Sequence, residues 1–328
     1  MKFDQPPKLN KIPTPDYDSF EGQYERKEKF TINGAEVESV DIKPKNQKDE
    51  VPVLVAPGWG ATMESFKPGM KVLAEKGRRV ISLDQPRKGG EILDAYNQDI
   101  EDWYNKKGEK HPDWPAEEVR KAQTMLGFLE QKKLERVDVI AHSEGAINVC
   151  IAAMLHPEKF AGRTIVLYSP AGLIGKDNIL RLNKGANANK STTETLSKES
   201  LDMIPEDSMR ESTKKYLQSP QTEYSKSTGH ITPDYLKANP VRAVKELWAI
   251  SQAQIEDMLR YLRDKSIKVV VVGAVDDTMF PMDKMQQNTQ ADFVDGFVSV
   301  RGGHMQIQVH PEVYMSAVES MLPQPEKK

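Results

Sequence analysis

The sequence predicts an α/β fold, with a doubly wound, mostly parallel sheet and an inserted helical cap. Short apolar runs typical of buried strands alternate with helical patterns at spacings that suit strand–helix–strand units. Between about residues 173 and 265 the strand pattern stops, and helical stretches with polar, Pro-containing loops replace it before the strands resume. The predicted organisation is an N-terminal arm (1–26), a core domain (27–172 and 266–328) and a helical cap (173–265).

Composition fits one catalytic domain with a sizeable insertion. The chain has 328 residues, of which 38% are hydrophobic and 29% charged, so a core can form under a well-solvated surface. Its net charge of -3 gives no reason to expect nucleic acid or an anionic membrane as a partner. The single cysteine, Cys150, excludes an internal disulfide, and a cytoplasmic location is expected. The polar first residues show no secretory signal, and no apolar run is long enough to span a membrane.

The first half of the chain predicts a hairpin followed by alternating strands and helices. Residues 27–45 predict the hairpin, because Asn33-Gly34 is a strong two-residue turn signal. Pro115 suits the first turn of a helix whose apolar stripe runs to about Lys132. Residues 91–112 give no clear pattern. Apolar runs and periodicity predict the other elements: strands at 51–56, 79–83, 136–141 and 164–168, and helices at 66–76 and 144–156.

The strand pattern resumes after the predicted cap. Apolar residues from Val244 to Leu262 predict one long amphipathic helix at the end of the cap. Four consecutive valines at 269–272 predict a buried strand. A helix at 282–288, a short strand at 297–300 and a last helix at 311–322 follow. This alternation after an insertion indicates a doubly wound sheet with a lid.

Residues 137–146 have the pattern of a nucleophile elbow. An apolar strand leads to Ser143, and a helical pattern follows. Such a sharp turn lifts the Ser hydroxyl clear of the sheet and needs small residues two before and two after it, here Ala141 and Gly145. The first of these is usually Gly. The chain here resembles the α/β-hydrolase family, in which the elbow Ser is the nucleophile; the alternative is a Ser that caps the helix in an ordinary turn.

The resemblance implies a triad in the chain order Ser, acid, His. His304 is the base candidate, because Gly302-Gly303-His304 resembles the histidine loop of the family and the glycines free the backbone to turn. The alternative is a loop His on a solvated surface. His142, beside the Ser, is expected to point elsewhere.

The acid of the triad is either Asp276 or Asp277. Their loop resembles the Gly-x-x-Asp-x-x-x-Pro loop of the family after the penultimate strand. Counting forward from Gly273 selects Asp276, whereas counting back from Pro281 selects Asp277. We favour Asp277, because Phe280-Pro281 is expected to anchor the following helix. The other Asp would then bond nearby main-chain N–H groups.

Two main-chain N–H groups are expected to form an oxyanion hole. One belongs to Glu144, directly after the Ser, and its side chain is expected at the rim of the pocket. The other belongs to Trp59, in a loop that resembles the His-Gly-x-Gly loop of the family with Pro57 in place of His. Gly58 and Gly60 let the backbone approach the substrate. The Trp59 side chain either lines the pocket or packs in the core.

A dinucleotide-binding unit is the rival interpretation of the same region. Gly58-x-Gly60 follows a strand and precedes a helix, and Asp84 stands about twenty residues further on. Met63 occupies the place of the third glycine, however, and this interpretation leaves the Ser, Asp and His loops unexplained.

The sequence therefore predicts a serine hydrolase that cleaves a small-molecule carboxylic ester through an acyl-enzyme intermediate. No metal site and no cofactor are expected, since the sequence has no Cys/His cluster and no phosphate-binding loop. Relatives with an Asp nucleophile are disfavoured by Ser143. An acyltransferase, a C–C or amide-bond hydrolase and a non-catalytic binding protein stay open, as do acyl-chain length, lid mobility and oligomeric state.

Overall fold

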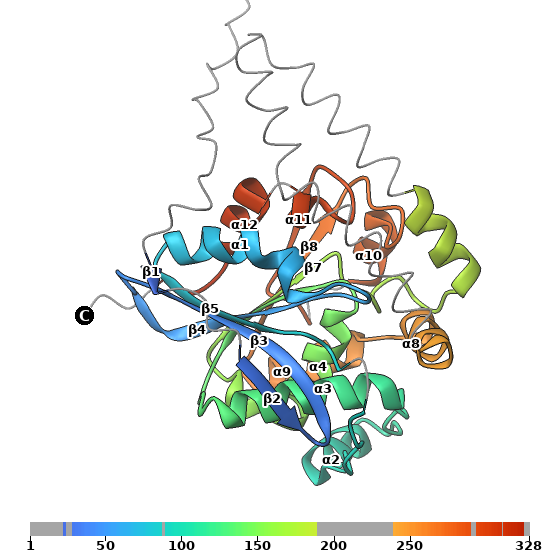
Figure 1. Ribbon diagram of the computed structural model, residues 1–328. Coiled ribbons are helices and arrows are strands. Elements are labelled where there is room, and N and C mark those ends of the chain that lie inside the picture. Colours follow the sequence, from blue (N-terminus) through green and yellow to red (C-terminus); the bar gives the residue numbers. More distant parts are fainter. Residues whose placement is uncertain are drawn as a thin grey trace, which may run out of the picture.

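A computed structural model describes residues 22–23, 28–86, 89–188, 239–289, 293–309 and 311–324. These residues form a nine-stranded sheet with helices on both faces (Figure 1). The strands are β1 (Gly22–Gln23), β2 (Glu28–Ile32), β3 (Ala35–Pro44), β4 (Asp49–Ala56), β5 (Arg78–Leu83), β6 (Asp138–His142), β7 (Thr164–Tyr168), β8 (Lys268–Ala274) and β9 (Gly296–Val300). The helices used below are α1 (Met63–Glu75), α2 (Gln98–Lys106), α3 (Ala116–Gln131), α4 (Gly145–Leu155), α8 (Pro240–Gln252), α9 (Glu256–Asp264), α10 (Met282–Asn288), α11 (Gln306–Val309) and α12 (Pro311–Glu319).

The sheet confirms the predicted doubly wound topology. Its strand order is β1-β3-β5-β4-β6-β7-β8-β9, with β2 paired to β3. Every pairing among β4 to β9 is parallel, and the hairpin strands β2 and β3 are antiparallel. Asn33 and Gly34 both have positive φ, as the predicted two-residue turn requires. Because the strands from β4 onwards run the same way, the loops that follow them gather at one edge of the sheet.

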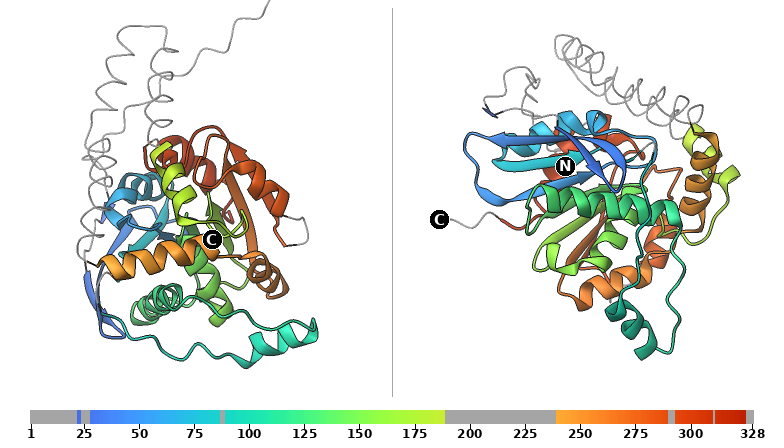
Figure 2. Two further views of the ribbon diagram at one scale, coloured as in Figure 1. Left: turned by 90° about the vertical axis from the view of Figure 1, so that its right-hand side faces the viewer. Right: turned by 60° about the horizontal axis from the view of Figure 1, so that its bottom comes forward.

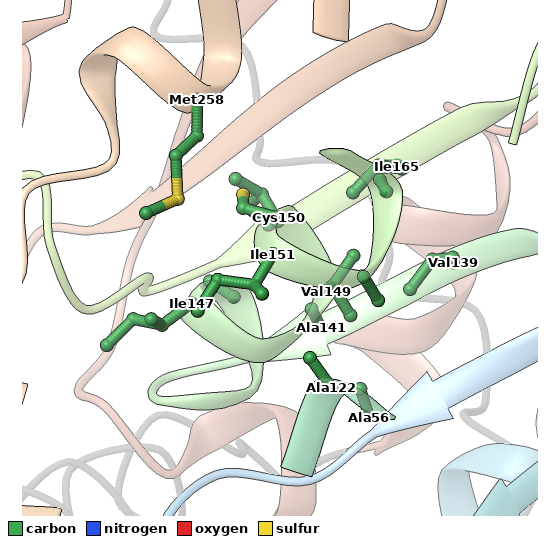
Figure 3. Close-up of a cluster of buried hydrophobic side chains, with 14 of the residues drawn as sticks. Ala56, Ala122, Val139, Ala141, Ile147, Val149, Cys150, Ile151, Ile165 and Met258 are labelled. Carbon is green, nitrogen blue, oxygen red and sulfur yellow. The ribbon is translucent and has the colours of Figure 1, made fainter. Parts of the chain in front are cut away.

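Two apolar layers separate the helices from the sheet. Helices α1, α11 and α12 cover one face, and α3, α4 and α9 cover the other (Figure 1). Helix α4 is apolar on all sides and buried, as expected of a helix enclosed by other elements. In Figure 3, Val149 and Cys150 of α4 lie among Val139 of β6, Ala122 of α3 and Met258 of α9. This packing fixes the helix that follows the elbow.

The predicted element boundaries agree with the structure within three residues, apart from the end of the predicted cap. The prediction of one long helix from Val244 to Leu262 is wrong. Extended backbone at Ala253 separates α8 from α9, and α9 packs on α4 and β8, within the core layer. The unassigned stretch 91–112 contains α2, which the Asn97 side chain caps by accepting the main-chain N–H of Asp99 at 3.0 Å.

Most of the predicted cap, residues 189–238, lies outside the described residues, as does most of the predicted N-terminal arm. Within the described residues, no helix has both the length and the apolar character needed to cross a membrane.

Candidate active site

Ser143 occupies a strained turn between β6 and α4. Its φ is +57°, in the left-handed region that side chains other than glycine rarely adopt. Its main-chain N–H donates to the carbonyl oxygen of Tyr168 at 3.1 Å, and its own carbonyl accepts from Ala171 at 3.1 Å. The strain is therefore held in place by the neighbouring strand β7, as expected of a nucleophile elbow.

The loop after β4 presses directly against this turn. A Cβ atom added at Gly58 would lie 2.7 Å from Cβ of Ser143, and one added at Gly145 would lie 2.6 Å from a main-chain oxygen at the end of β4. Both positions therefore need glycine for close approach rather than for flexibility. As a result, Trp59 and Glu144, the two predicted oxyanion-hole residues, belong to segments in direct contact.

The structure pairs His304 with Asp277. Nδ1 of His304 lies 2.8 Å from Oδ2 of Asp277, and both side chains are buried. The other carboxylate oxygen, Oδ1, accepts the main-chain N–H groups of Met279 at 2.8 Å and Phe280 at 2.9 Å. Because a carboxylate only accepts, the His304 proton in this hydrogen bond is on Nδ1. That arrangement leaves Nε2 of His304 free of a proton in the neutral ring, as a general base requires.

Asp276 has a different partner. Its Oδ2 accepts the main-chain N–H of Gly302 at 3.0 Å, and its own N–H donates to the carbonyl of Gly302 at 3.0 Å. Gly302 has a φ of +108°, which favours glycine. Asp276 thus ties the acid loop to the backbone of the histidine loop, whereas Asp277 contacts the His304 ring.

His142 makes a contact that the sequence analysis missed. Its Nε2 lies 2.9 Å from the main-chain carbonyl oxygen of His304, and the two rings lie 4.5 Å apart. Burial, and then the neighbouring His304, lowers the pKa of His142 well below its usual value. His142 is therefore neutral and donates from Nε2 to the carbonyl. It connects the elbow to the histidine loop, 162 residues away in the chain, so no local pattern could reveal the contact.

The Glu144 side chain does not lie at a pocket rim as expected. It is fully buried, and its Oε1 lies 2.5 Å from Nζ of Lys121 on α3, which draws the carboxylate inward. The Trp59 ring packs against the core cluster, as one of the two expectations had it. Its indole N–H also donates to Oε2 of Glu246 on α8 at 2.9 Å.

Comparison with known families identifies the fold that carries this site. Residues 51–311 match the sequence model of the family described as alpha/beta hydrolase fold. The chain belongs to the α/β-hydrolase family. A comparison with curated proteins gives no significant match.

Several solved structures resemble this α/β hydrolase at low sequence identity. An enol-lactonase from Burkholderia xenovorans LB400 is 13% identical with a TM-score of 0.57, over 89% of this chain and 98% of its own. A thermophilic esterase from Thermogutta terrifontis is 16% identical with a TM-score of 0.56, over 90% and 97%. A serine hydrolase involved in carbazole degradation is 17% identical with a TM-score of 0.52, over 90% and 98%. At these identities the likeness shows the fold alone.

The structure gives Asp84 of this α/β hydrolase a role that does not involve a dinucleotide. Its Oδ1 accepts the main-chain N–H of Met63 at 2.8 Å, so the carboxylate caps the N-terminus of α1. In a dinucleotide-binding unit that terminus would face the pyrophosphate. Across the part of the chain that the structure describes, no group of three or more His, Cys, Asp or Glu side chains is placed to hold a metal ion.

Proposed function

We propose that this α/β hydrolase is a serine hydrolase that cleaves small-molecule carboxylic esters. The observation that carries the proposal is the buried His304–Asp277 pair with its 2.8 Å hydrogen bond, together with a Ser143 held at positive φ in the elbow. The His142 contact to the His304 backbone supports it, since it joins the elbow to the histidine loop. A Ser, a His and a carboxylate in this order are the groups that acyl transfer needs.

In the proposed mechanism, Oγ of Ser143 attacks the ester carbonyl while Nε2 of His304 takes the Ser proton. Asp277 stabilises the resulting imidazolium through its hydrogen bond to Nδ1. His304 then gives the proton to the leaving alcohol, and the acyl group stays on Ser143. His304 next activates a water molecule, whose attack releases the carboxylic acid and restores the hydroxyl.

The main-chain N–H groups of Trp59 and Glu144 are proposed to bind the oxyanion in both steps. Glu144 directly precedes α4, where N–H groups have no acceptor within the helix and the helix dipole favours negative charge. The contact between the Gly58 loop and the elbow supports placing the two donors together. Each donor would contribute about 3 kcal/mol to transition-state binding.

The proposed substrate class, carboxylic esters, draws on the proteins that share the fold. An esterase and an enol-lactonase, two enzymes of ester chemistry, are among the structures that share the fold. We propose that the proposed cap selects the acyl group, because it follows β7 and because Glu246 of its helix α8 contacts Trp59. An acyltransferase or an amide-bond hydrolase would use the same triad with a different acceptor or scissile bond.

Hydrolysis of p-nitrophenyl esters of increasing acyl length tests the proposal. Wild-type turnover that falls at least about 10³-fold in Ser143→Ala would support it. Ser266→Ala is a matched control, since Ser266 also has positive φ (+59°) but lies in a turn remote from the elbow. The ester-hydrolase proposal would be overturned if Ser143→Ala keeps its turnover. It would also be overturned if the folded wild type hydrolyses none of the esters.

A further inference from the structure

Four ionisable side chains form a buried cluster behind the candidate oxyanion hole. Glu118 and Lys121 come from α3, Glu144 from the elbow and Glu246 from α8, and all four are at most 4% exposed. We call them the Glu–Lys cluster. Buried ion pairs rarely add stability compared with apolar residues of the same size, because removing charges from water is costly. The presence of four such groups at one place therefore calls for a functional explanation.

The contacts of the Glu–Lys cluster run in a continuous series. Nζ of Lys121 lies 2.5 Å from Oε1 of Glu144 and 3.2 Å from Oε1 of Glu246. The second carboxylate oxygen of Glu246, Oε2, accepts the indole N–H of Trp59 at 2.9 Å. The two residues proposed to supply the oxyanion donors, Trp59 and Glu144, are thus connected through their side chains by Lys121 and Glu246.

The protonation states are compatible with this series. Burial alone would lower the pKa of Lys121, but the adjacent Glu144, Glu118 and Glu246 outweigh burial and raise the pKa, so the ammonium stays charged. Burial, and then the charge of Glu144, raises the pKa of Glu118 well above its usual value. These surroundings favour the protonated form of Glu118 over its carboxylate.

Helix α8, which belongs to the proposed cap, carries Glu246 of the cluster. It crosses one end of the core domain next to α3, as the left view of Figure 2 shows. Arg242, one turn before Glu246, fastens the helix to the loop after β5: its Nη2 donates to the carbonyl of Gly89 at 2.9 Å and its Nη1 to that of Pro86 at 3.3 Å. Glu246 is the α8 residue whose contacts reach the Trp59 loop.

The side-chain connection between Trp59 and Glu144 matters because an oxyanion hole needs accurately placed donors. Donors act only when they lie about 2.7–3.1 Å from the developing charge, and a displacement of about 1 Å can cost about 10²-fold in rate. We propose that Glu246 is a positioning residue that, through Lys121, fixes the position of the Trp59 loop relative to Glu144. This inference rests on the proposed serine-hydrolase function. The placement of α8 then controls the oxyanion hole through a buried carboxylate.

Glu246→Gln is the first test, with ester hydrolysis as the readout. An amide has one acceptor oxygen in place of two, so it cannot serve Trp59 and Lys121 with separate oxygens as the carboxylate does. We expect kcat to fall about 10- to 100-fold with KM nearly unchanged, because the contact matters for the transition state rather than for substrate binding. Glu319→Gln is the matched control: it weakens a comparable contact, Glu319 with the buried Arg78 at 3.1 Å on the opposite face, and should leave kcat unchanged.

A double-mutant cycle with Trp59→Phe separates positioning from general loss of structure. Phe keeps an aromatic ring and removes the indole N–H, so both single variants act on the contact between residues 59 and 246. If Glu246 acts through Trp59, the double variant is no slower than the slower single variant. The inference would be overturned if the losses of kcat in the two single variants multiply in the double variant. It would also be overturned if kcat of Glu246→Gln stays within about threefold of wild type.

The outcomes also separate this inference from the proposed function. If the wild type hydrolyses esters and the Glu246→Gln and Trp59→Phe variants keep its kcat, only the positioning role is overturned. If the folded wild type is inactive, the proposed function and the positioning role are both overturned. If Glu246→Gln does not fold, as judged by circular dichroism, Trp59→Phe decides by itself. An unchanged kcat in folded Trp59→Phe overturns the inference, and a lower kcat at unchanged KM supports it.

Discussion

Replacing Asp277 by Asn should remove most of the activity while leaving the fold intact. Oδ1 of Asp277 accepts two main-chain N–H groups, and Oδ2 accepts the Nδ1–H of His304. The single oxygen of the introduced amide would stay with the two N–H donors, because each buried donor left without an acceptor costs about 1–3 kcal/mol. The amide NH₂ group would then face Nδ1, which must accept. The ring proton moves to Nε2, and His304 can no longer take a proton from Ser143.

The same change in a serine protease triad lowers kcat about 10⁴-fold, which corresponds to about 5.5 kcal/mol of transition-state stabilisation. We expect a loss of this size in Asp277→Asn, measured as kcat for a p-nitrophenyl ester. Asp276→Asn is the matched control, since Asn keeps an oxygen for the Gly302 N–H, and its kcat should stay within about threefold of wild type. Urea unfolding of both variants checks the fold. A greater loss in Asp276→Asn than in Asp277→Asn would refute the assignment of the acid.

Three further changes test other contacts of the site. Gly145→Ala places a methyl group 2.6 Å from a main-chain oxygen of β4, so ester turnover should fall at least about 10²-fold; near-wild-type turnover would contradict the close approach. Because the pKa of His142 is lowered by burial, wild-type stability should be complete above its usual pKa of 6.5 and decline as pH falls, by up to about 1.4 kcal/mol per pH unit. Urea midpoints of His142→Gln should decline less steeply, and equal slopes would count against the buried neutral ring. The pKa of Glu118 is raised by burial and by Glu144, so its contribution to stability is complete below its usual pKa of 4.5 and is lost as pH rises. Glu118→Gln should therefore be more stable than wild type at pH 7 in the same titration, and lower stability would refute the raised pKa of Glu118.

The elements that sequence predicted well are those with a strong local signal. The Asn33-Gly34 turn, the strand into Ser143 and the apolar helix after it each follow from residue types within about ten positions. Asp276 and Asp277 are adjacent, and counting residues from Gly273 or from Pro281 does not decide which of them is the triad acid. The packing of the histidine loop distinguishes the two, because Asp276 accepts the main-chain N–H of Gly302 and Asp277 contacts the His304 ring.

The parts of the site that sequence missed depend on partners far along the chain. The sequence pattern predicts a start for α1 three residues too late, because Asp84, 21 residues further on, supplies the cap for Met63. Charged residues such as Lys121 normally occupy the solvated face of a helix, and this one is buried because α8 brings Glu246 over it. The sequence predicts the Glu144 side chain at a pocket rim for the same reason, because the partner that draws it inward lies on another helix.

The most direct test of the central claim is labelling with a fluorophosphonate probe followed by peptide mass mapping. The proposed mechanism predicts one adduct, on Ser143, with no adduct in Ser143→Ala and slow labelling in Asp277→Asn. Folded wild-type protein that takes up no probe, or takes it up on another residue, would contradict an activated Ser143.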